Sequence, residues 1–67
     1  MDTINLIVSK NIKQARQEKD LSLDELARLS GVSKSMLAQI ERGSGNPSLT
    51  TLWKIADGMK VPFSRLI

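Results

Sequence analysis

Residues that start and stop helices recur about every ten positions in the central part of this chain. Ser22, Ser33 and Ser48 each stand where a serine hydroxyl can accept a hydrogen bond from the first turn of a following helix. Gly31 and Gly43 follow two of the segments so opened, and glycine tolerates the left-handed conformation common at helix C-termini. This spacing leaves room only for short helices joined by tight turns.

The apolar residues between these signals have the period of amphipathic helices. Ile4, Val8, Ile12 and Ala15 recur every three or four positions and predict a first helix over about 3–19. No run alternates between apolar and polar residues as a half-buried strand would. The sequence therefore predicts an all-α fold.

Four further helical segments are expected after the first. Ser22 and Glu25 have the spacing of a capping box at the start of the second segment. The segments are a second helix from Ser22 to Gly31, a third from Lys34 to Arg42, a fourth after Ser48 and a short fifth from Pro62 to Leu66. The fourth helix is expected to turn inward Leu49, Leu52, Ile55, Ala56 and Met59, and the fifth to close the core with Phe63 and Leu66. The prediction is a five-helix domain.

Composition excludes several classes of function. The 67 residues form one small domain over 1–67, with 40% hydrophobic and 25% charged residues. Cysteine and histidine are both absent, which removes thiolate nucleophiles, imidazole bases and the ligands of nearly all zinc sites. We therefore expect no metal or cofactor.

The longest apolar run has three residues, so we expect a cytoplasmic protein without a membrane segment. A net charge of +3 favours polyanionic partners.

The stretch 23–43 has the spacing of a helix-turn-helix. Ala27 is small where two crossing helices touch, and Gly31 stands at the tight turn between them. Leu37 and Ile40 define the buried side of the following helix. The alternative is that any small helical bundle has capped helices and tight turns.

The outer face of the third helix separates these two interpretations. The residues opposite the buried side are Ser35, Ala38, Gln39 and Arg42, with Lys34 at the exposed start. None is both bulky and apolar, so this face fits a DNA major groove. Gln39 could bond to adenine, Lys34 to guanine, and Ser35 to either base. For each residue alone, a solvated polar side chain is the competing interpretation.

Other positions are candidates for contacts with the DNA backbone. The first amides of the helices opened by Ser22 and Ser48 carry partial positive charge and could bind phosphate. Side-chain contacts to phosphate could come from Arg42, Ser44, Asn46 and Thr50. Lys10, Lys13 and Lys19 would add a general positive field. Because serines cap helices in all kinds of protein, a purely structural role remains open for Ser22 and Ser48.

Arg16 and Glu41 are candidates for a structural ion pair. Each lies at the border of its helix's apolar face, where a charge needs a partner. If they pair, they tie the first helix to the end of the third and fix its angle.

Four further motifs occur along the chain: LSLDELA at 21–27, GVSKS at 31–35, IERG at 40–43 and NPSL at 46–49. Together they resemble the Cro/C1-type helix-turn-helix family of phage repressors and bacterial regulators. The resemblance implies a lambda-repressor-like domain with five helices that binds palindromic operator DNA, usually as a homodimer. It places the recognition helix at 34–42, base contacts at Ser33, Lys34, Ser35 and Gln39, and the ion pair at Arg16 and Glu41.

Three positions depart from the family pattern. Leu23 replaces a glutamine common in relatives, so a phosphate contact there would come from backbone amides. Lys60 replaces the usual glycine after the fourth helix, and Ser30 replaces a residue that is often apolar. The segment 51–64 resembles regulators in which this domain precedes a cupin barrel, and a small-molecule effector is expected only if such a further domain exists.

The leading prediction is sequence-specific binding of double-stranded DNA by a transcriptional regulator, with repression favoured over activation. The alternative is a protein-interaction module such as an antitoxin, for which Trp53 and Phe63 would supply an exposed apolar patch. Trp53 itself is expected to pack against the fifth helix or to lie in a dimer interface. An enzyme is the weakest alternative, because the adjacent Asp24 and Glu25 point to different helix faces.

Overall fold

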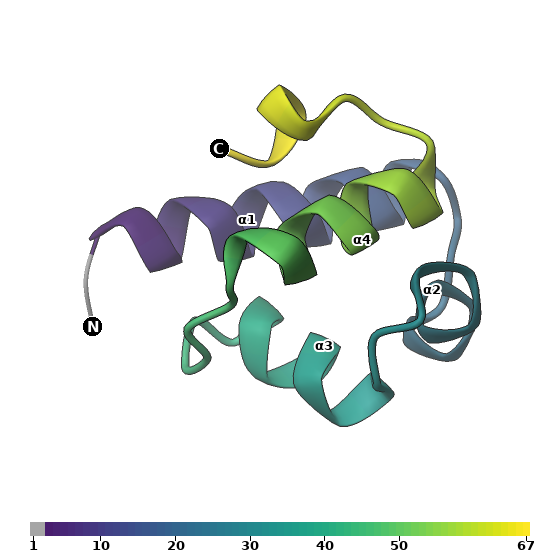
Figure 1. Cartoon of the computed structure of the whole chain (residues 1–67), viewed down its shortest axis with the longest axis horizontal. Helices are drawn as coiled ribbons and strands as arrows, with labels where there is room; N and C mark the ends of the chain where they lie inside the picture. The colour runs from purple at the N-terminus through teal and green to yellow at the C-terminus, as the bar shows by residue number, and fades with distance from the viewer. Residues whose placement is uncertain (1–2) are drawn as a thin grey trace.

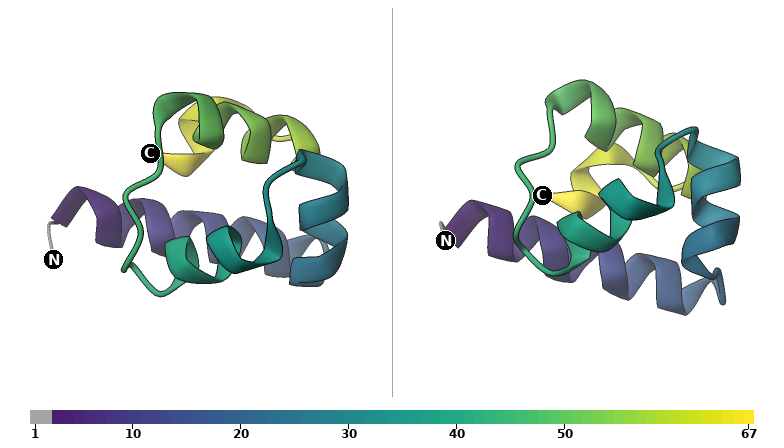
Figure 2. Two further views of the ribbon diagram at one scale, coloured as in Figure 1. Left: turned by 60° about the horizontal axis from the view of Figure 1, so that its bottom comes forward. Right: turned by 90° about the horizontal axis from the view of Figure 1, so that it is seen from below.

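The fold is all-helical in the part of the chain that the computed structural model describes, residues 3–67. Its elements are α1 (Thr3–Glu18), α2 (Leu23–Ser30), α3 (Lys34–Glu41), α4 (Leu49–Met59) and the 3-10 helix η1 (Phe63–Leu66). Figure 1 shows α3 below α1 and α4, with η1 on the opposite side of the molecule, and Figure 2 shows α3 crossing in front of α1 when the molecule is turned. The predicted all-α class is confirmed, and no strand occurs within these residues.

The predicted fifth helix is a single 3-10 turn, so residues 3–67 form four α-helices rather than five. The backbone N–H of Arg65 donates to the carbonyl of Pro62 at 2.9 Å, three residues earlier, as a 3-10 helix requires. Pro62 has no N–H and precedes only four helical residues, which is too short a run for an α-helical ladder.

The predicted caps and turns are present at the positions where the sequence signals them. The hydroxyls of Ser22, Ser33 and Ser48 each accept a hydrogen bond from the backbone N–H three residues later. Gly31 and Gly43 have φ values of 76° and 75°, in the left-handed region that favours glycine. The third helix ends one residue earlier than predicted, at Glu41, with Arg42 as its C-cap.

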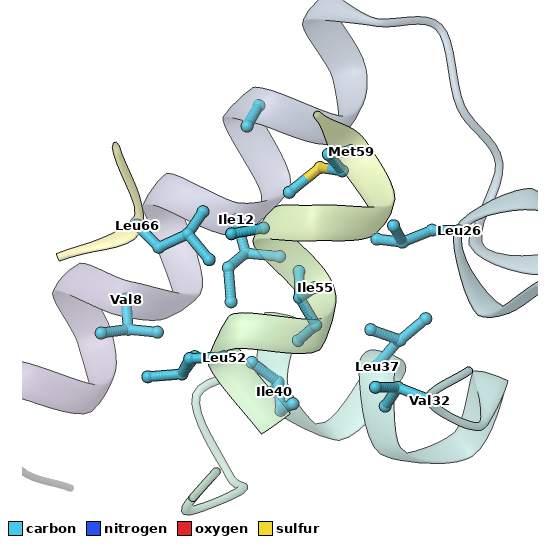
Figure 3. Close-up of a cluster of buried hydrophobic side chains, with 12 residues drawn as sticks. Val8, Ile12, Leu26, Val32, Leu37, Ile40, Leu52, Ile55, Met59 and Leu66 are labelled. Carbon is cyan, nitrogen blue, oxygen red and sulfur yellow. The ribbon is translucent and has the colours of Figure 1, made fainter. Parts of the chain in front are cut away.

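The core gathers side chains from all five elements (Figure 3). Its fully buried large members are Ile12, Leu26, Leu37, Ile40, Ile55, Met59 and Leu66. Two residues predicted to face inward are exposed instead, Ile4 at 72% and Leu49 at 64%. Both lie in the first turn of their helices, and periodicity identifies a helix's apolar face without showing how far its neighbours extend along it.

The departures at Ser30 and Lys60 have structural explanations. A Cβ atom on Gly58 would lie 2.8 Å from the Cα of Ser30, so α2 and α4 approach closely there. Ser30 also accepts a hydrogen bond from Val32 N–H at 3.1 Å across the turn. Lys60 caps α4 in the left-handed conformation, with φ of 58°, as its replacement of a glycine implied.

No helix in residues 3–67 has the length and apolarity needed to cross a bilayer.

Candidate nucleic-acid interface

The outer face of α3 lies at the surface. Gly31 and Val32 turn the chain between α2 and α3, and Leu37 and Ile40 anchor α3 to the core. The residues expected to face outward, Lys34, Ser35, Gln39 and Arg42, are exposed. Ala38, expected on the same face, is half-buried. Figure 2, left, shows α3 brought toward the viewer on this side of the molecule.

The four predicted base-contacting residues differ in how far their side chains are already engaged. The Ser33 hydroxyl accepts from Met36 N–H at 3.1 Å as the cap of α3. Lys34 Nζ lies 3.3 Å from Asp24 Oδ2. Within residues 3–67 the Ser35 and Gln39 side chains form no hydrogen bond, so their polar groups are available to a ligand.

The predicted phosphate-contacting residues lie at the surface, with one exception. Arg42, Ser44, Asn46, Ser48, Thr50 and Ser22 are exposed. The Ser44 hydroxyl donates to the Gln39 carbonyl at 3.2 Å, which fixes the start of the loop after α3. Leu23 is half-buried against the core, which leaves its backbone N–H as the group that could meet a phosphate.

Electrostatics distinguish the N-termini of α2 and α4. Asp24 and Glu25 stand in the first turn of α2, whereas the first turn of α4 has no acidic residue. The Glu25 carboxylate accepts from Ser22 N–H at 2.8 Å, and this backbone hydrogen bond lowers the pKa of Glu25 below its usual range. The α4 N-terminus capped by Ser48 therefore suits a phosphate better than that of α2, where carboxylates oppose one.

A largely buried ion pair joins α1 to the end of α3, as the sequence predicts. Arg16 Nε donates to a Glu41 carboxylate oxygen at 2.7 Å and Arg16 Nη2 to the other at 2.9 Å. The two side chains are 14% and 7% exposed. Arg16 also donates to the Leu21 carbonyl at 2.7 Å, so its guanidinium links α1 both to the end of α3 and to the turn before α2. The hydrogen bond to Glu41 raises the pKa of Arg16, against the opposing effect of burial.

Ser9 is a further residue at this junction that sequence reasoning missed. Its hydroxyl donates to the Glu41 backbone carbonyl at 2.6 Å, and the residue is 6% exposed. The signal was its place three residues before Ile12, on the apolar face of α1, where a small polar residue needs a buried partner. The end of α3 is thus held to α1 through both its side chain and its backbone.

The apolar residues that could support a protein interface lie on α4 and η1. The Trp53 and Phe63 rings stack, with centroids 4.5 Å apart and planes at 19°. Trp53 therefore packs on the fifth segment as predicted, yet it remains 56% exposed, and Leu49 on the same helix is 64% exposed. Residues 3–67 contain no pocket and no cluster of acidic residues that could hold a metal ion.

The chain belongs to the helix-turn-helix family, which matches it over residues 12–66. Its relatives are transcription regulators. It is 49% identical over 67 residues to the HTH-type transcriptional regulator SutR of Escherichia coli, of which it spans 38%. It is 37% identical over 62 residues to the immunity repressor of Bacillus phage phi105, covering 92% of this chain and 43% of the repressor.

Solved structures show the same fold. A transcriptional regulator of this family from Vibrio cholerae superimposes with a TM-score of 0.92 at 46% identity, over 94% of this chain and 35% of that one. The restriction-modification controller protein C.Esp1396I, solved as a tetramer with its 35-base-pair operator, gives a TM-score of 0.90 at 31% identity, over 92% and 82% of the two chains.

Proposed function

We propose that this chain is a sequence-specific, double-stranded DNA-binding domain of a transcriptional regulator, with residues 34–42 as the recognition helix in the major groove. The observation that carries the proposal is the polar, exposed outer face of α3 on a helix-turn-helix whose end is fixed by the Arg16–Glu41 pair. The stripe opposite the buried side of α3 carries no large apolar side chain, and the exposed Met36 lies at its edge, so the helix fits a groove about 12 Å wide.

Base contacts come from the start and the middle of α3. Gln39 presents an unengaged amide, which can bond to adenine N6 and N7 together. Ser35 offers a hydroxyl to either base type, and Lys34 an ammonium to guanine O6 or N7. The Ser33 hydroxyl already accepts a hydrogen bond from Met36 N–H as the cap of α3. Its proton and its second lone pair are what it can still offer to a base.

Contacts with phosphate position the domain on the duplex. The α4 N-terminus at Ser48 and Thr50 supplies backbone amides without nearby carboxylates. Arg42, Ser44 and Asn46 supply side chains from the loop before it. At the α2 N-terminus, the Ser22 N–H already donates to the Glu25 carboxylate, so Ser22 contributes only its hydroxyl proton and Leu23 its backbone N–H. This end of α2 therefore binds phosphate more weakly than the start of α4.

The assembled regulator is a homodimer on a palindromic operator, located in the cytoplasm, which represses by occupying a promoter and catalyses no reaction. The phage immunity repressor among its relatives and the operator-bound tetramer of C.Esp1396I support this assignment. Half-sites one helical turn apart gain affinity when two copies are linked. The exposed Trp53 and Leu49 supply apolar area for such a contact.

Selection of bound duplexes from a random DNA pool, at a stated salt concentration, tests the proposal. We expect a palindromic consensus, and affinity for it that falls more slowly with salt than affinity for a scrambled duplex. A pool that remains random after selection would contradict sequence-specific binding.

The second candidate function is protein interaction, such as that of an antitoxin, and the exposure of Trp53 and Leu49 favours it. The Trp53→Ala variant distinguishes DNA binding from protein interaction. If the chain is a DNA-binding domain, the affinity of one copy for a half-site stays unchanged in this variant. If it is a protein-interaction module, the variant no longer binds its protein partner.

A further inference from the structure

An exposed ion pair connects the first turns of the two helices of the helix-turn-helix. Lys34 Nζ at the start of α3 lies 3.3 Å from Asp24 Oδ2 in the first turn of α2. The side chains are 58% and 75% exposed. Pairs as exposed as this one add little to stability, so the pair has little structural purpose.

The position of Asp24 is unfavourable for a protein that binds a polyanion. It stands in the first turn of α2, a candidate phosphate contact, and its carboxylate lies 3.3 Å from Lys34, a candidate base contact. The neighbouring Glu25 carboxylate has a structural task, because it completes the capping box with Ser22. Asp24 makes no such hydrogen bond within its helix: apart from its favourable place at the positive end of the α2 dipole, its partner in residues 3–67 is Lys34.

Pairing with Asp24 restricts what Lys34 can do. A lysine ammonium is a flexible point charge with three donors, and unpaired it would bind whichever phosphate lay within reach. One donor held by Asp24 keeps the ammonium over the start of α3 and leaves two for a base edge. The carboxylate at the same time opposes a phosphate at this place.

We propose that Asp24 is a specificity-determining residue that acts through Lys34. By holding the ammonium toward the bases, it weakens sequence-independent binding to the DNA backbone more than it weakens binding to the correct site. The inference rests on the proposed function, since it requires α3 to face DNA. It predicts that the acidic residue lowers affinity for random DNA and raises discrimination.

The test compares Asp24→Asn with the wild type on two labelled duplexes, the selected consensus and a scrambled version, by fluorescence anisotropy at several salt concentrations. Asn keeps the size of the side chain and removes its charge. We expect affinity for the scrambled duplex to rise about two- to fivefold and affinity for the consensus to change less, so that the specificity ratio falls.

Two further variants isolate the role of Lys34. Asp57→Asn removes one negative charge from an exposed position on α4 and is expected to shift both duplexes by one common factor. Lys34→Met removes the ammonium, and in that background Asp24→Asn is expected to leave the specificity ratio unchanged.

Two results would overturn the inference. If Asp24→Asn behaves like Asp57→Asn and shifts both duplexes equally, Asp24 acts only through net charge. If its effect on the ratio persists in the Lys34→Met background, Asp24 acts on DNA directly. A wild-type chain that binds both duplexes with equal affinity would instead contradict the proposed function, which keeps the two failures distinguishable.

Discussion

An ion pair stands at each end of α3, and the two pairs differ in almost every physical respect. At the C-terminal end, Arg16 and Glu41 are largely buried and are joined by two hydrogen bonds of 2.7 and 2.9 Å. At the N-terminal end, Lys34 and Asp24 are exposed and make one contact of 3.3 Å. Breaking a buried pair leaves an uncompensated charge in the protein, whereas water replaces either partner of an exposed one.

The difference indicates a structural role for the C-terminal end of α3 and a binding role for its N-terminal end. The Glu41 end fixes the angle of α3 against α1, with Ser9 as a second attachment. The Lys34 end stays solvated, so the ammonium donors that Asp24 does not hold are available when DNA arrives. A recognition helix needs both properties. A helix whose angle varies cannot hold its side chains opposite particular base pairs, and a helix whose polar groups are all paired has no donors left for the bases.

Glu41→Ala should have the largest effect, about 3–5 kcal/mol of lost folding stability, because it strands the Arg16 guanidinium at a mostly buried site. For a domain of this size the loss lowers Tm by more than about 10 °C. Thermal denaturation followed by circular dichroism measures it. A melt unchanged by the substitution would remove the buried pair from the account. Arg16→Met combined with Glu41→Leu serves as a control and should recover much of the loss.

Ser9→Ala should cost less, about 1–3 kcal/mol, because it removes one neutral donor and leaves the Glu41 carbonyl without that partner. Urea denaturation gives the free energy of unfolding. The control is Ser35→Ala, which lies on the exposed face of α3 and should stay within about 0.5 kcal/mol of the wild type. Equal effects of the two alanines would mean that the Ser9 contact contributes nothing.

Asp24→Asn should change stability least among the ion-pair variants, by less than about 1 kcal/mol, because water and salt already screen this pair. The same urea experiment applies, repeated at high salt. A loss as large as that of Glu41→Ala would contradict the contrast between the two ends of α3.

Acid should weaken the capping box at the start of α2 by a small amount. The hydrogen bond from Ser22 N–H lowers the pKa of Glu25 from its ordinary value of 4.5, so the folded state binds fewer protons than the unfolded chain. Its contribution is therefore complete above about pH 4.5 and is lost as the pH falls through the lowered pKa.

The urea midpoint between pH 3 and pH 7 measures this effect. Glu25→Gln keeps a capping residue without the charge and should flatten the acid part of the curve. Glu18 contributes in the same direction, because its hydrogen bond with Arg65 lowers the Glu18 pKa. Glu18→Gln should therefore also make the urea midpoint less dependent on pH in acid, independently of Glu25. An acid limb in Glu25→Gln identical to that of the wild type would contradict the assignment.

Local signals made much of the fold predictable from the sequence. The serine caps, the left-handed glycines and the 3.6-residue period act within a few residues, so they can be found without the tertiary structure. The outer face of α3 followed from the same period, as did the location of Arg16 and Glu41 beside the core.

The features that sequence reasoning missed depend on neighbours distant in the chain. The exposure of Ile4 and Leu49 reflects where the packed elements end. The contact of Ser9 with the Glu41 carbonyl spans 32 positions, and that of Lys34 with Asp24 depends on the crossing of two helices. Periodicity gives the direction in which a side chain points along its own helix and leaves its partner undetermined.

Gln39→Ala shows whether the outer face of α3 recognises base pairs. Dissociation constants are measured for the selected consensus and a scrambled duplex at one salt concentration. We expect a loss of about 1–3 kcal/mol on the consensus, which is roughly five- to 150-fold, with little change on the scrambled duplex. Equal losses on the two duplexes would contradict it.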